Sequence, residues 1–376
     1  MRDLAAQYRL VELQREELKI QCKVDDYEQW GAPALDPNGY QAKEKTQRQT
    51  AHSQRGSIFW ALVERKPSDT GSFGDDDDSQ DDGMVAGVDA IVCHCESHMF
   101  DCAFRKANGE IIEGYSHHIG SVFTLPAHRG KGLARFFLTG VAQRMQKKKC
   151  TIASVLYSDI GPTFYDKLGW RLHPSDMVVL DSSASKNMEE PSALMTDFVL
   201  DDAFDKFLAT DNERLKKEMQ SAKYEGREVF APLPSRDSID WQFCLGVFYA
   251  RHRGFPRFPS RCGVKIDADA FVVWCHNLKE STLYIVHARF PSSAPARTVQ
   301  LLRSALTEAR AFGLSSVKIW DPCGAVLDQL VSSDLDLVKT TREDSLSSLL
   351  IFPQHRTGSP TEPLPVWLNN EKLAWV

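Results

Sequence analysis

The sequence predicts an α/β fold with a mixed sheet, organised in two successive units. Apolar runs typical of buried strands alternate with amphipathic helical stretches in both halves of the chain. Asn108-Gly109 is a typical two-residue hairpin turn, so part of the sheet should be antiparallel. The 376 residues also exceed what a single hydrophobic core usually organises. We therefore expect domains at 1–182 and 241–376, joined by a linker and helical segment at 183–240.

The N-terminal part is predicted to contain a helix, a strand and an acidic loop. Apolar residues recur at helical spacing from Leu4 to Cys22, and Ile58 to Val63 form a compact apolar run. The segment 67–83 carries Asp75-Asp76-Asp77-Asp78 and too little apolar surface to pack, so we expect a disordered loop. The acidic block lacks the ligand spacing and closing glutamate of a calcium loop, so we expect no metal there.

A strand–helix–strand crossover is predicted next. Met84 to Phe104 and Glu110 to Leu125 form two long strands on either side of the Asn-Gly turn. Apolar residues then follow at four-residue spacing from Leu133 to Met145, as on one face of a helix. Thr151 to Leu156 returns as a strand.

The second half repeats this alternation after a polar break at Asp181 to Pro191. Its predicted elements are a helical region at Met195 to Ala222, strands at Ala270 to Cys275 and Thr282 to Ala288, a helix at Ala296 to Phe312, and a strand at Ser315 to Trp320. The segment before that helix, 289–295, contains no glycine, so we expect no diphosphate site in the second half.

The composition restricts the partners and the compartment. The 45 basic and 51 acidic side chains give a mildly acidic chain, which offers no general attraction to nucleic acid or to an anionic membrane. The nine cysteines include no Cys-x-x-Cys pair, so we expect a reducing compartment. No apolar run approaches the roughly 18 residues that span a bilayer, and we expect a cytoplasmic protein.

The chemistry is predicted at the turn between the second long strand and the helix. There the chain reads Arg129-Gly130-Lys131-Gly132-Leu133-Ala134. Two glycines let backbone amides approach an anion at the positive end of the helix dipole. A diphosphate is the ligand that such a turn fits, although glycines at a helix start also serve plain packing.

This turn resembles the pyrophosphate-binding motif of the GNAT acetyltransferases, Arg/Gln-x-x-Gly-x-Gly/Ala after a strand. A second segment, 157–170, is similar to the family's strand end, short helix and Phe-Tyr-x-x-x-Gly-aromatic turn. The resemblance implies a GNAT fold for residues 1–180, followed by a degenerate GNAT-like domain. A likeness to fungal lysine N6-acetyltransferases rests on Ser121-Val122-Phe123-Thr124 and Ser158-Asp159-Ile160-Gly161-Pro162.

The resemblance also implies acetyl-coenzyme A as cosubstrate, with no metal. Its contacts would be backbone groups of one strand, the amides of the glycine turn and the second motif. These residues are Phe123, Thr124, Leu125, Arg129, Gly130, Lys131, Gly132, Leu133, Ala134, Ser158, Pro162 and Phe164.

Acetyl transfer to an amine needs a base for the amine and an acid for the departing thiolate. By analogy with the family, the phenol of Tyr165 is the acid. Two groups compete as base: His118, eleven positions before Arg129, and the carboxylate of Val376, because some tandem-domain acetyltransferases place the terminal carboxylate in the site. Strand alternation puts His118, Gly120, Val122 and Thr124 on one face and His117 on the other. A packing role for His118 remains open.

The acceptor that the resemblance implies is free L-lysine. Asp240 and Trp241 lie in a segment similar to the fungal lysine enzymes, although a helix start and a core tryptophan explain them equally well. Another small amine, a protein lysine, or a non-catalytic coenzyme A-binding module are the alternatives. Cys93-His94-Cys95 is not expected to bind zinc, because alternation sends the histidine away from both cysteines.

Overall fold

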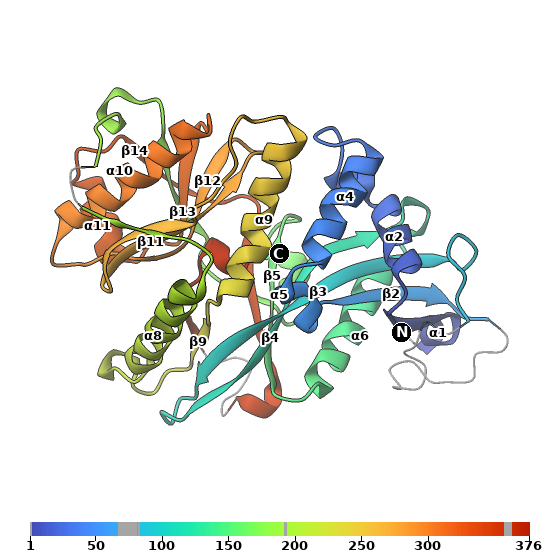
Figure 1. The fold of residues 1–376 in the computed structure, drawn as a ribbon. Coiled ribbons are helices and arrows are strands. Elements are labelled where there is room, and N and C mark those ends of the chain that lie inside the picture. Colours follow the sequence, from blue (N-terminus) through green and yellow to red (C-terminus); the bar gives the residue numbers. More distant parts are fainter. Residues whose placement is uncertain (1, 67–80, 82, 192–193, 357–362) are drawn as a thin grey trace.

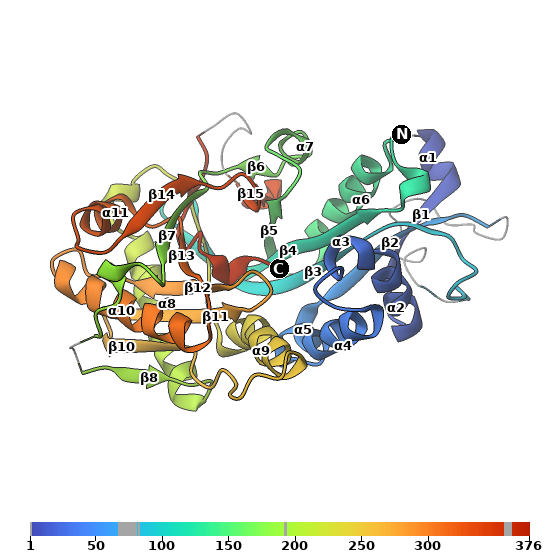
Figure 2. The same ribbon diagram turned by 90° about the horizontal axis from the view of Figure 1, so that it is seen from above.

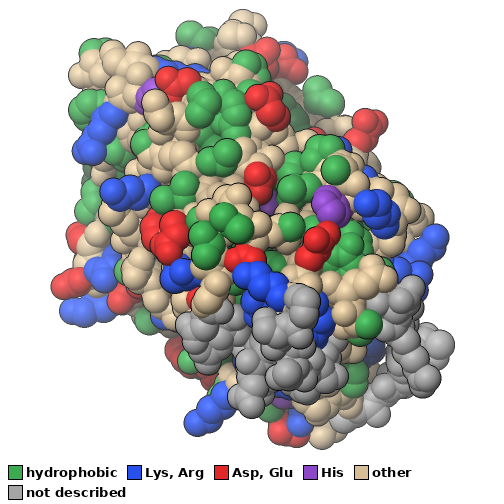
Figure 3. Space-filling model, turned by 90° about the vertical axis from the view of Figure 1, so that its right-hand side faces the viewer, with side chains coloured by type: hydrophobic (Ala, Val, Ile, Leu, Met, Phe, Trp, Pro, Cys, Tyr) green, Lys and Arg blue, Asp and Glu red, His purple; other side chains and the backbone are tan. Residues whose placement is uncertain are grey.

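A computed structural model describes residues 2–66, 81, 83–191, 194–356 and 363–376. Two mixed sheets lie side by side with helices packed against them, as Figure 1 shows, which confirms the predicted α/β fold. None of the described helices is long and apolar enough to cross a membrane. On the face drawn in Figure 3, the basic and acidic side chains of the described residues are interspersed with apolar ones.

The first sheet is formed mainly by the N-terminal half. Its described strands are β1 (Tyr8–Leu13), β2 (Ile58–Glu64), β3 (Ile91–Arg105), β4 (Ile111–Thr124), β5 (Thr151–Ser158), β6 (Arg171–Leu172), β9 (Val229–Pro232), β15 (Leu346–Ile351) and β16 (Val366–Trp367). The main order is β1-β2-β3-β4-β5-β15-β6, with β9 between β3 and β16. β4 and β5 pair in parallel, whereas β3 and β4 form the predicted hairpin, with Gly109 in its turn at φ 92°.

The second sheet follows the same plan. Its described strands are β7 (Asp176–Asp181), β8 (Thr196–Phe198), β10 (Gly263–Asp267), β11 (Ala270–Asn277), β12 (Thr282–Arg289), β13 (Ser316–Trp320) and β14 (Leu337–Thr341). They are ordered β14-β7-β13-β12-β11-β10-β8, and β12 and β13 pair in parallel around helix α10 (Pro295–Ala311). The predicted alternation in the second half is confirmed.

The two sheets exchange strands along the chain. β9, β15 and β16 come from the second half and join the first sheet, while β7 lies before residue 182 and joins the second. These pairings link distant segments, and local periodicity does not reveal them. We therefore keep as a proposal the predicted division of the chain into two domains and a linker, with limits 1–182, 183–240 and 241–376.

The helices cover both faces of the first sheet (Figure 2). The other described helices are α1 (Arg2–Gln7), α2 (Glu16–Asp25), α3 (Tyr27–Trp30), α4 (Pro37–Arg48), α5 (Ala51–Gly56), α6 (Leu133–Lys147), α7 (Thr163–Asp166), α8 (Asp202–Met219), α9 (Arg236–His252) and α11 (Gly324–Val331). Helix α6 lies on one face, and α2 to α5 lie on the other. Helix α9 contacts α4, α5 and β11, so it joins the two halves.

The helix predicted from Leu4 to Cys22 is wrong. Its middle is β1, which pairs with β2 in register from Tyr8–Glu64 to Leu13–Phe59. Leu10 and Val11 are both fully buried, because the strand is covered on its two faces. Three short elements in succession produced apolar spacing that resembled one helix.

The acidic loop is described only in part. Residues 67–80 and 82 lie outside the described residues. Asp81 is buried, and its Oδ2 accepts hydrogen bonds from the N–H groups of Gln14 (2.8 Å) and Arg15 (2.9 Å). For Asp81 the predicted disorder is wrong, because its carboxylate accepts hydrogen bonds from the amides that precede α2.

Candidate active site

The strands β4 and β5 separate where the site was predicted. Their parallel pairing runs from Tyr115–Thr151 to Ile119–Leu156. β4 continues to Thr124 and remains paired with β3. Beyond Ile119, the edge of β4 that faces β5 therefore has backbone groups available for an extended ligand.

A β-bulge lies at the start of this gap. Gly120 is opposite Glu96 and Phe123 is opposite His94, so two residues of β4 oppose one residue of β3. Ser121, in the bulge, has φ 52°. The bulge reverses the alternation that we predicted: Phe123, and not Thr124, continues the face of His118 and Gly120.

Two of the predicted cofactor contacts after the bulge, Thr124 and Leu125, differ in whether their backbone groups are free to bind a ligand. The N–H of Leu125 donates to the Val92 carbonyl (3.0 Å), and its carbonyl accepts from the N–H of His128 (2.9 Å). Leu125 thus has both backbone groups engaged. Because neighbouring residues of a strand turn their backbone groups to opposite edges, those of Thr124 face the gap. Its carbonyl accepts from Arg129 Nε (2.9 Å).

The glycine turn has the geometry of an anion site. Arg129, Gly130, Lys131 and Gly132 are exposed, and the glycines adopt φ 76° and 78°. Gly132 precedes α6 without a side-chain cap, so the first amides of this 15-residue helix are available to a ligand. Leu133, the first residue of α6, is buried in the core beneath the sheet and fixes the helix start.

The second motif places Tyr165 at the end of β5. Ser158 Oγ donates to the Gly161 carbonyl (2.8 Å), and this tight turn leads through Pro162 into α7. The rings of Phe164 and Tyr165 meet edge to face at 5.0 Å. Burial, with smaller effects of Cys95 and Asp159, raises the pKa of Tyr165. The phenol therefore stays protonated, and burial at the same time makes it a weaker acid than free tyrosine.

The structure places His118, one of the two predicted bases, in a buried and hydrogen-bonded position. It is fully buried, with Nδ1 2.7 Å from the Ala374 carbonyl and Nε2 2.8 Å from Ser116 Oγ. Burial lowers its pKa to about 3, despite the carbonyl. Both nitrogens are therefore engaged, and His118 contacts the C-terminal segment through the Ala374 carbonyl; its role as a base stays a prediction. His117 is also buried, with its pKa lowered to about 4 mainly by burial.

The C-terminal segment runs between the two halves and reaches β4 (Figure 2). Gln242 Nε2, from α9, donates to the carbonyls of Lys372 (2.9 Å) and Leu373 (2.7 Å). A carboxyl oxygen of Val376 lies 3.0 Å from the point where a Cβ on Gly120 would stand. The carboxylate of Val376 is thus placed beside the bulge, on the face opposite α6. Gln242 gave no recognisable signal in the sequence.

The weak substrate candidates lie at the start of α9. Helix α9 starts in this region, as predicted, and Ser235 caps it through a capping box with Ser238. Trp241 is buried, with its ring 4.8 Å from that of His98 on β3. Asp240 is half-buried and lines a small cavity between α4 and α9, where burial raises its pKa.

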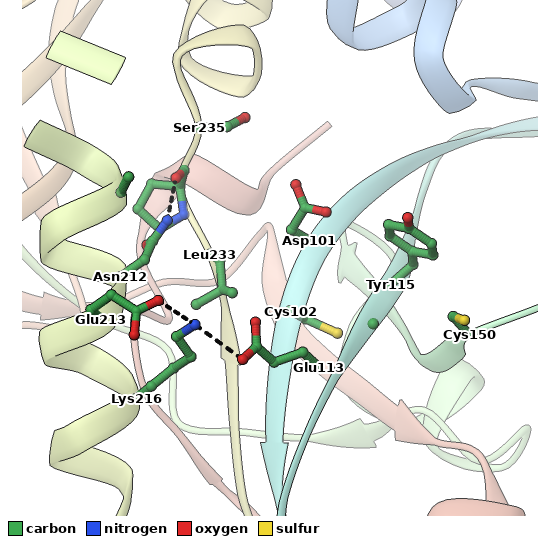
Figure 4. A pocket seen from close by; sticks show the side chains of 13 residues that line it. Asp101, Cys102, Glu113, Tyr115, Cys150, Asn212, Glu213, Lys216, Leu233 and Ser235 are labelled. Atoms are coloured by element: carbon green, nitrogen blue, oxygen red, sulfur yellow. Dashed lines mark hydrogen bonds and ion pairs between the residues drawn. The ribbon is translucent and has the colours of Figure 1, made fainter. Parts of the chain in front are cut away.

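A cavity of about 440 Å³ lies elsewhere, between the β3–β4 hairpin and α8 (Figure 4). Lys216 of α8 forms ion pairs with Glu213 and with Glu113 of β4 (3.0 Å) across it. None of its lining residues is a predicted site residue. This cavity is therefore separate from the glycine turn.

A protein-family model matches more than half of the chain. The model described as the LYC1 GNAT-like C-terminal domain matches residues 179–376. A yeast relative, the uncharacterized protein YGR111W of Saccharomyces cerevisiae, is 23% identical over 386 residues, which cover 95% of this chain and 91% of the relative. A lysine acetyltransferase of Yarrowia lipolytica is 22% identical over 239 residues, which cover 53% of this chain and 60% of the relative.

Solved structures share the fold. A GCN5-related N-acetyltransferase from Kribbella flavida superposes with a TM-score of 0.52 at 14% identity, covering 92% of this chain and 72% of the other. A probable N-acyltransferase from Enterococcus faecalis V583 has the same TM-score and coverages at 12% identity. At these identities the likeness shows the arrangement of two GNAT-like sheets.

Proposed function

Because the chain belongs to the GNAT acetyltransferases, with a LYC1 GNAT-like C-terminal domain, we propose that it acetylates the N6-amine of free L-lysine from acetyl-coenzyme A. The relative from Yarrowia lipolytica supports lysine as the acceptor, since it is a lysine acetyltransferase. The gap between β4 and β5, followed directly by the glycine turn at α6, is the observation that carries the proposal.

These two features fit the two parts of acetyl-coenzyme A. The free edge of β4 offers backbone donors and acceptors to the extended pantetheine arm. The uncapped amides at the start of α6 suit the diphosphate, and the open space around Gly130 and Gly132 lets it approach. Acetyl-coenzyme A supplies an acetyl thioester, which reacts with a neutral amine.

We assign the two proton transfers to Tyr165 and Val376. The carboxylate of Val376 accepts a proton from the substrate ammonium, and the neutral amine then attacks the thioester carbonyl carbon. Tyr165 donates its phenolic proton as the carbon–sulfur bond breaks, so the thiol leaves neutral. The nitrogen of the new amide then returns its remaining extra proton to the Tyr165 phenolate, and the carboxyl group of Val376 releases its proton to solvent. Gln242 and His118 act as positioning residues, because they hold the carbonyls of residues 372–374.

Chain extension tests the role of Val376. Two glycines added after Val376 displace the carboxylate from Gly120 and should lower kcat at least about tenfold, since general base catalysis contributes 10² or more. Binding of coenzyme A, measured by calorimetry, should not change. Full activity of the extended chain would remove Val376 from the mechanism.

The activity itself is tested with the purified chain and acetyl-coenzyme A. Free thiol is followed with L-lysine, other amino acids, polyamines and lysine-containing peptides as acceptors. We expect the highest kcat/KM with L-lysine. Turnover with peptides alone would replace free lysine as the acceptor, and no turnover with any amine would contradict acetyl transfer.

A further inference from the structure

A buried ion cluster lies on the face of the first sheet that carries Gly120. Lys23 of α2 is its centre, with Nζ 3.3 Å from Glu44 Oε2, 3.6 Å from Asp26 Oδ2 and in contact with Glu96 Oε1. All four side chains are at most 8% exposed. Its members lie on α2, directly after α2, on α4 and on β3, so no local sequence pattern brings them together.

The cluster carries an excess of negative charge. Lys43 also pairs with Glu44 (2.6 Å), so two ammonium groups face three carboxylates. Burial raises the pKa of Asp26 to about 6, even though Lys23 lowers it. Neighbouring His98 cannot supply the missing charge, because burial lowers its pKa to about 3. An uncompensated buried charge is unfavourable, so a further cation would stabilise the cluster.

The cluster also borders the position of the acceptor amine. Glu96 is the register partner of Gly120, and Lys23 Nζ lies 3.4 Å from Ser121 Oγ in the bulge. The Val376 carboxylate lies against Gly120. Glu96 is thus on the same face as Val376, one strand spacing of about 4.8 Å farther from the β4–β5 gap.

Two buried polar groups beside the cluster have no hydrogen-bond partner among the described residues. They are His52 Nε2 and Trp241 Nε1, in side chains that are 3% and 5% exposed. Both rings pack on His98, with centroids 6.2 Å and 4.8 Å away. Buried polar groups are normally paired, so these two atoms are available to pair with a polar ligand. The indole face also suits a cation.

Glu96 differs from Glu44 in the use of its oxygens. Glu44 Oε1 contacts Lys43 and Oε2 contacts Lys23. Glu96 Oε1 contacts Lys23, but Oε2 lies 3.7 Å from His98 Nε2, which is longer than a hydrogen bond. One oxygen of Glu96 can therefore take a ligand, whereas both oxygens of Glu44 are engaged.

From this arrangement we propose that Glu96 binds a second ammonium group of the acceptor, so that the acceptor is a diamine or a dibasic amino acid. One amine lies at Val376 and reacts, while the other lies against Glu96 and stays charged. The inference rests on the proposed acetyl transfer and specifies its acceptor. Neither of these two contacts involves a carboxyl group of the acceptor.

Cadaverine and pentylamine test this directly, because they have the same five-carbon chain and differ in the second amine. We expect the wild-type protein to favour cadaverine at least about tenfold in kcat/KM, as a hydrogen bond to a charged group implies. Glu96→Gln should reduce the preference to about twofold, the statistical factor for two equivalent amines. Glu96→Asp should give an intermediate ratio, and Glu113→Gln, which lies outside the cluster at the ion pair with Lys216, should retain the wild-type ratio.

Thermal unfolding of each variant verifies that it folds. Equal kcat/KM for the two amines in the wild type, or an unchanged ratio in Glu96→Gln, would overturn the role of Glu96 while acetyl transfer stands. If no amine is turned over, acetyl transfer itself fails. Calorimetric titration with cadaverine in the presence of coenzyme A then decides the inference: binding weakened by Glu96→Gln supports it, and absent or unchanged binding rejects it.

Discussion

Replacing Gly120 by alanine tests the placement of the Val376 carboxylate at the catalytic centre. An added Cβ would lie 3.0 Å from the Val376 oxygen, 3.1 Å from its carbonyl carbon and 3.2 Å from its Cγ2. Contacts this short require the C-terminal residue to move by a few tenths of an ångström. Since a displacement of about 1 Å at a reacting group costs on the order of 100-fold, kcat should fall roughly four- to tenfold.

Steady-state kinetics at saturating acetyl-coenzyme A measures the effect on kcat. The KM for acetyl-coenzyme A should remain within about twofold, because the glycine turn at α6 is unchanged. Gly324→Ala is the matched control, since no atom lies within 4 Å of its added Cβ. An unchanged kcat in Gly120→Ala, or an equal decrease in Gly324→Ala, would refute the assigned position of the carboxylate.

Three further predictions concern the acid and the C-terminal segment. Tyr165→Phe should lower kcat about 100-fold with little change in the KM for acetyl-coenzyme A. Tyr157→Phe removes a buried hydroxyl that has no partner among the described residues, and it should leave kcat unchanged. Similar losses of kcat in both variants would contradict a proton donor at Tyr165. Gln242→Ala leaves buried carbonyls of the C-terminal segment unpaired, so it should lower the free energy of unfolding by about 1–3 kcal/mol and should also lower kcat. An unchanged kcat would show that this anchoring contact is not needed for catalysis. Burial lowers the pKa of His287, but Glu371 and Asp211 raise it from 6.5 to about 9. Its stabilisation is therefore full below pH 6.5 and is lost as the pH rises through about 9. Denaturant titrations should show the stability difference between wild type and His287→Gln shrinking by about 3 kcal/mol over this range, and a constant difference would contradict the charged histidine.

Local patterns were sufficient for much of the N-terminal sheet. Asn108-Gly109 predicted the hairpin, and the spacing from Leu133 to Met145 predicted α6. The glycine turn was found because positive φ at Gly130 and Gly132 requires that residue type. In each case the signal lies within a few consecutive residues.

Long-range contacts account for what the sequence did not reveal. β15 joins β5 although nearly 200 residues separate them in the chain, and no periodicity encodes that pairing. The bulge at Ser121 reversed the predicted strand face, since its non-glycine positive φ has no sequence signature. Lys23 lies just beyond the stretch predicted as a helix, Leu4 to Cys22, and only the fold brings Glu44 and Glu96 to its ammonium group.

The central claim is that this chain transfers acetyl groups to lysine at the gap between β4 and β5. Mass spectrometry of a reaction containing the purified chain, acetyl-coenzyme A and L-lysine tests it most directly. We predict N6-acetyl-lysine in amounts that match the thiol released, and loss of the product when Tyr165 is replaced by phenylalanine. Release of thiol without acetylated lysine, or acetylation that persists unchanged in the Tyr165 variant, would contradict the account.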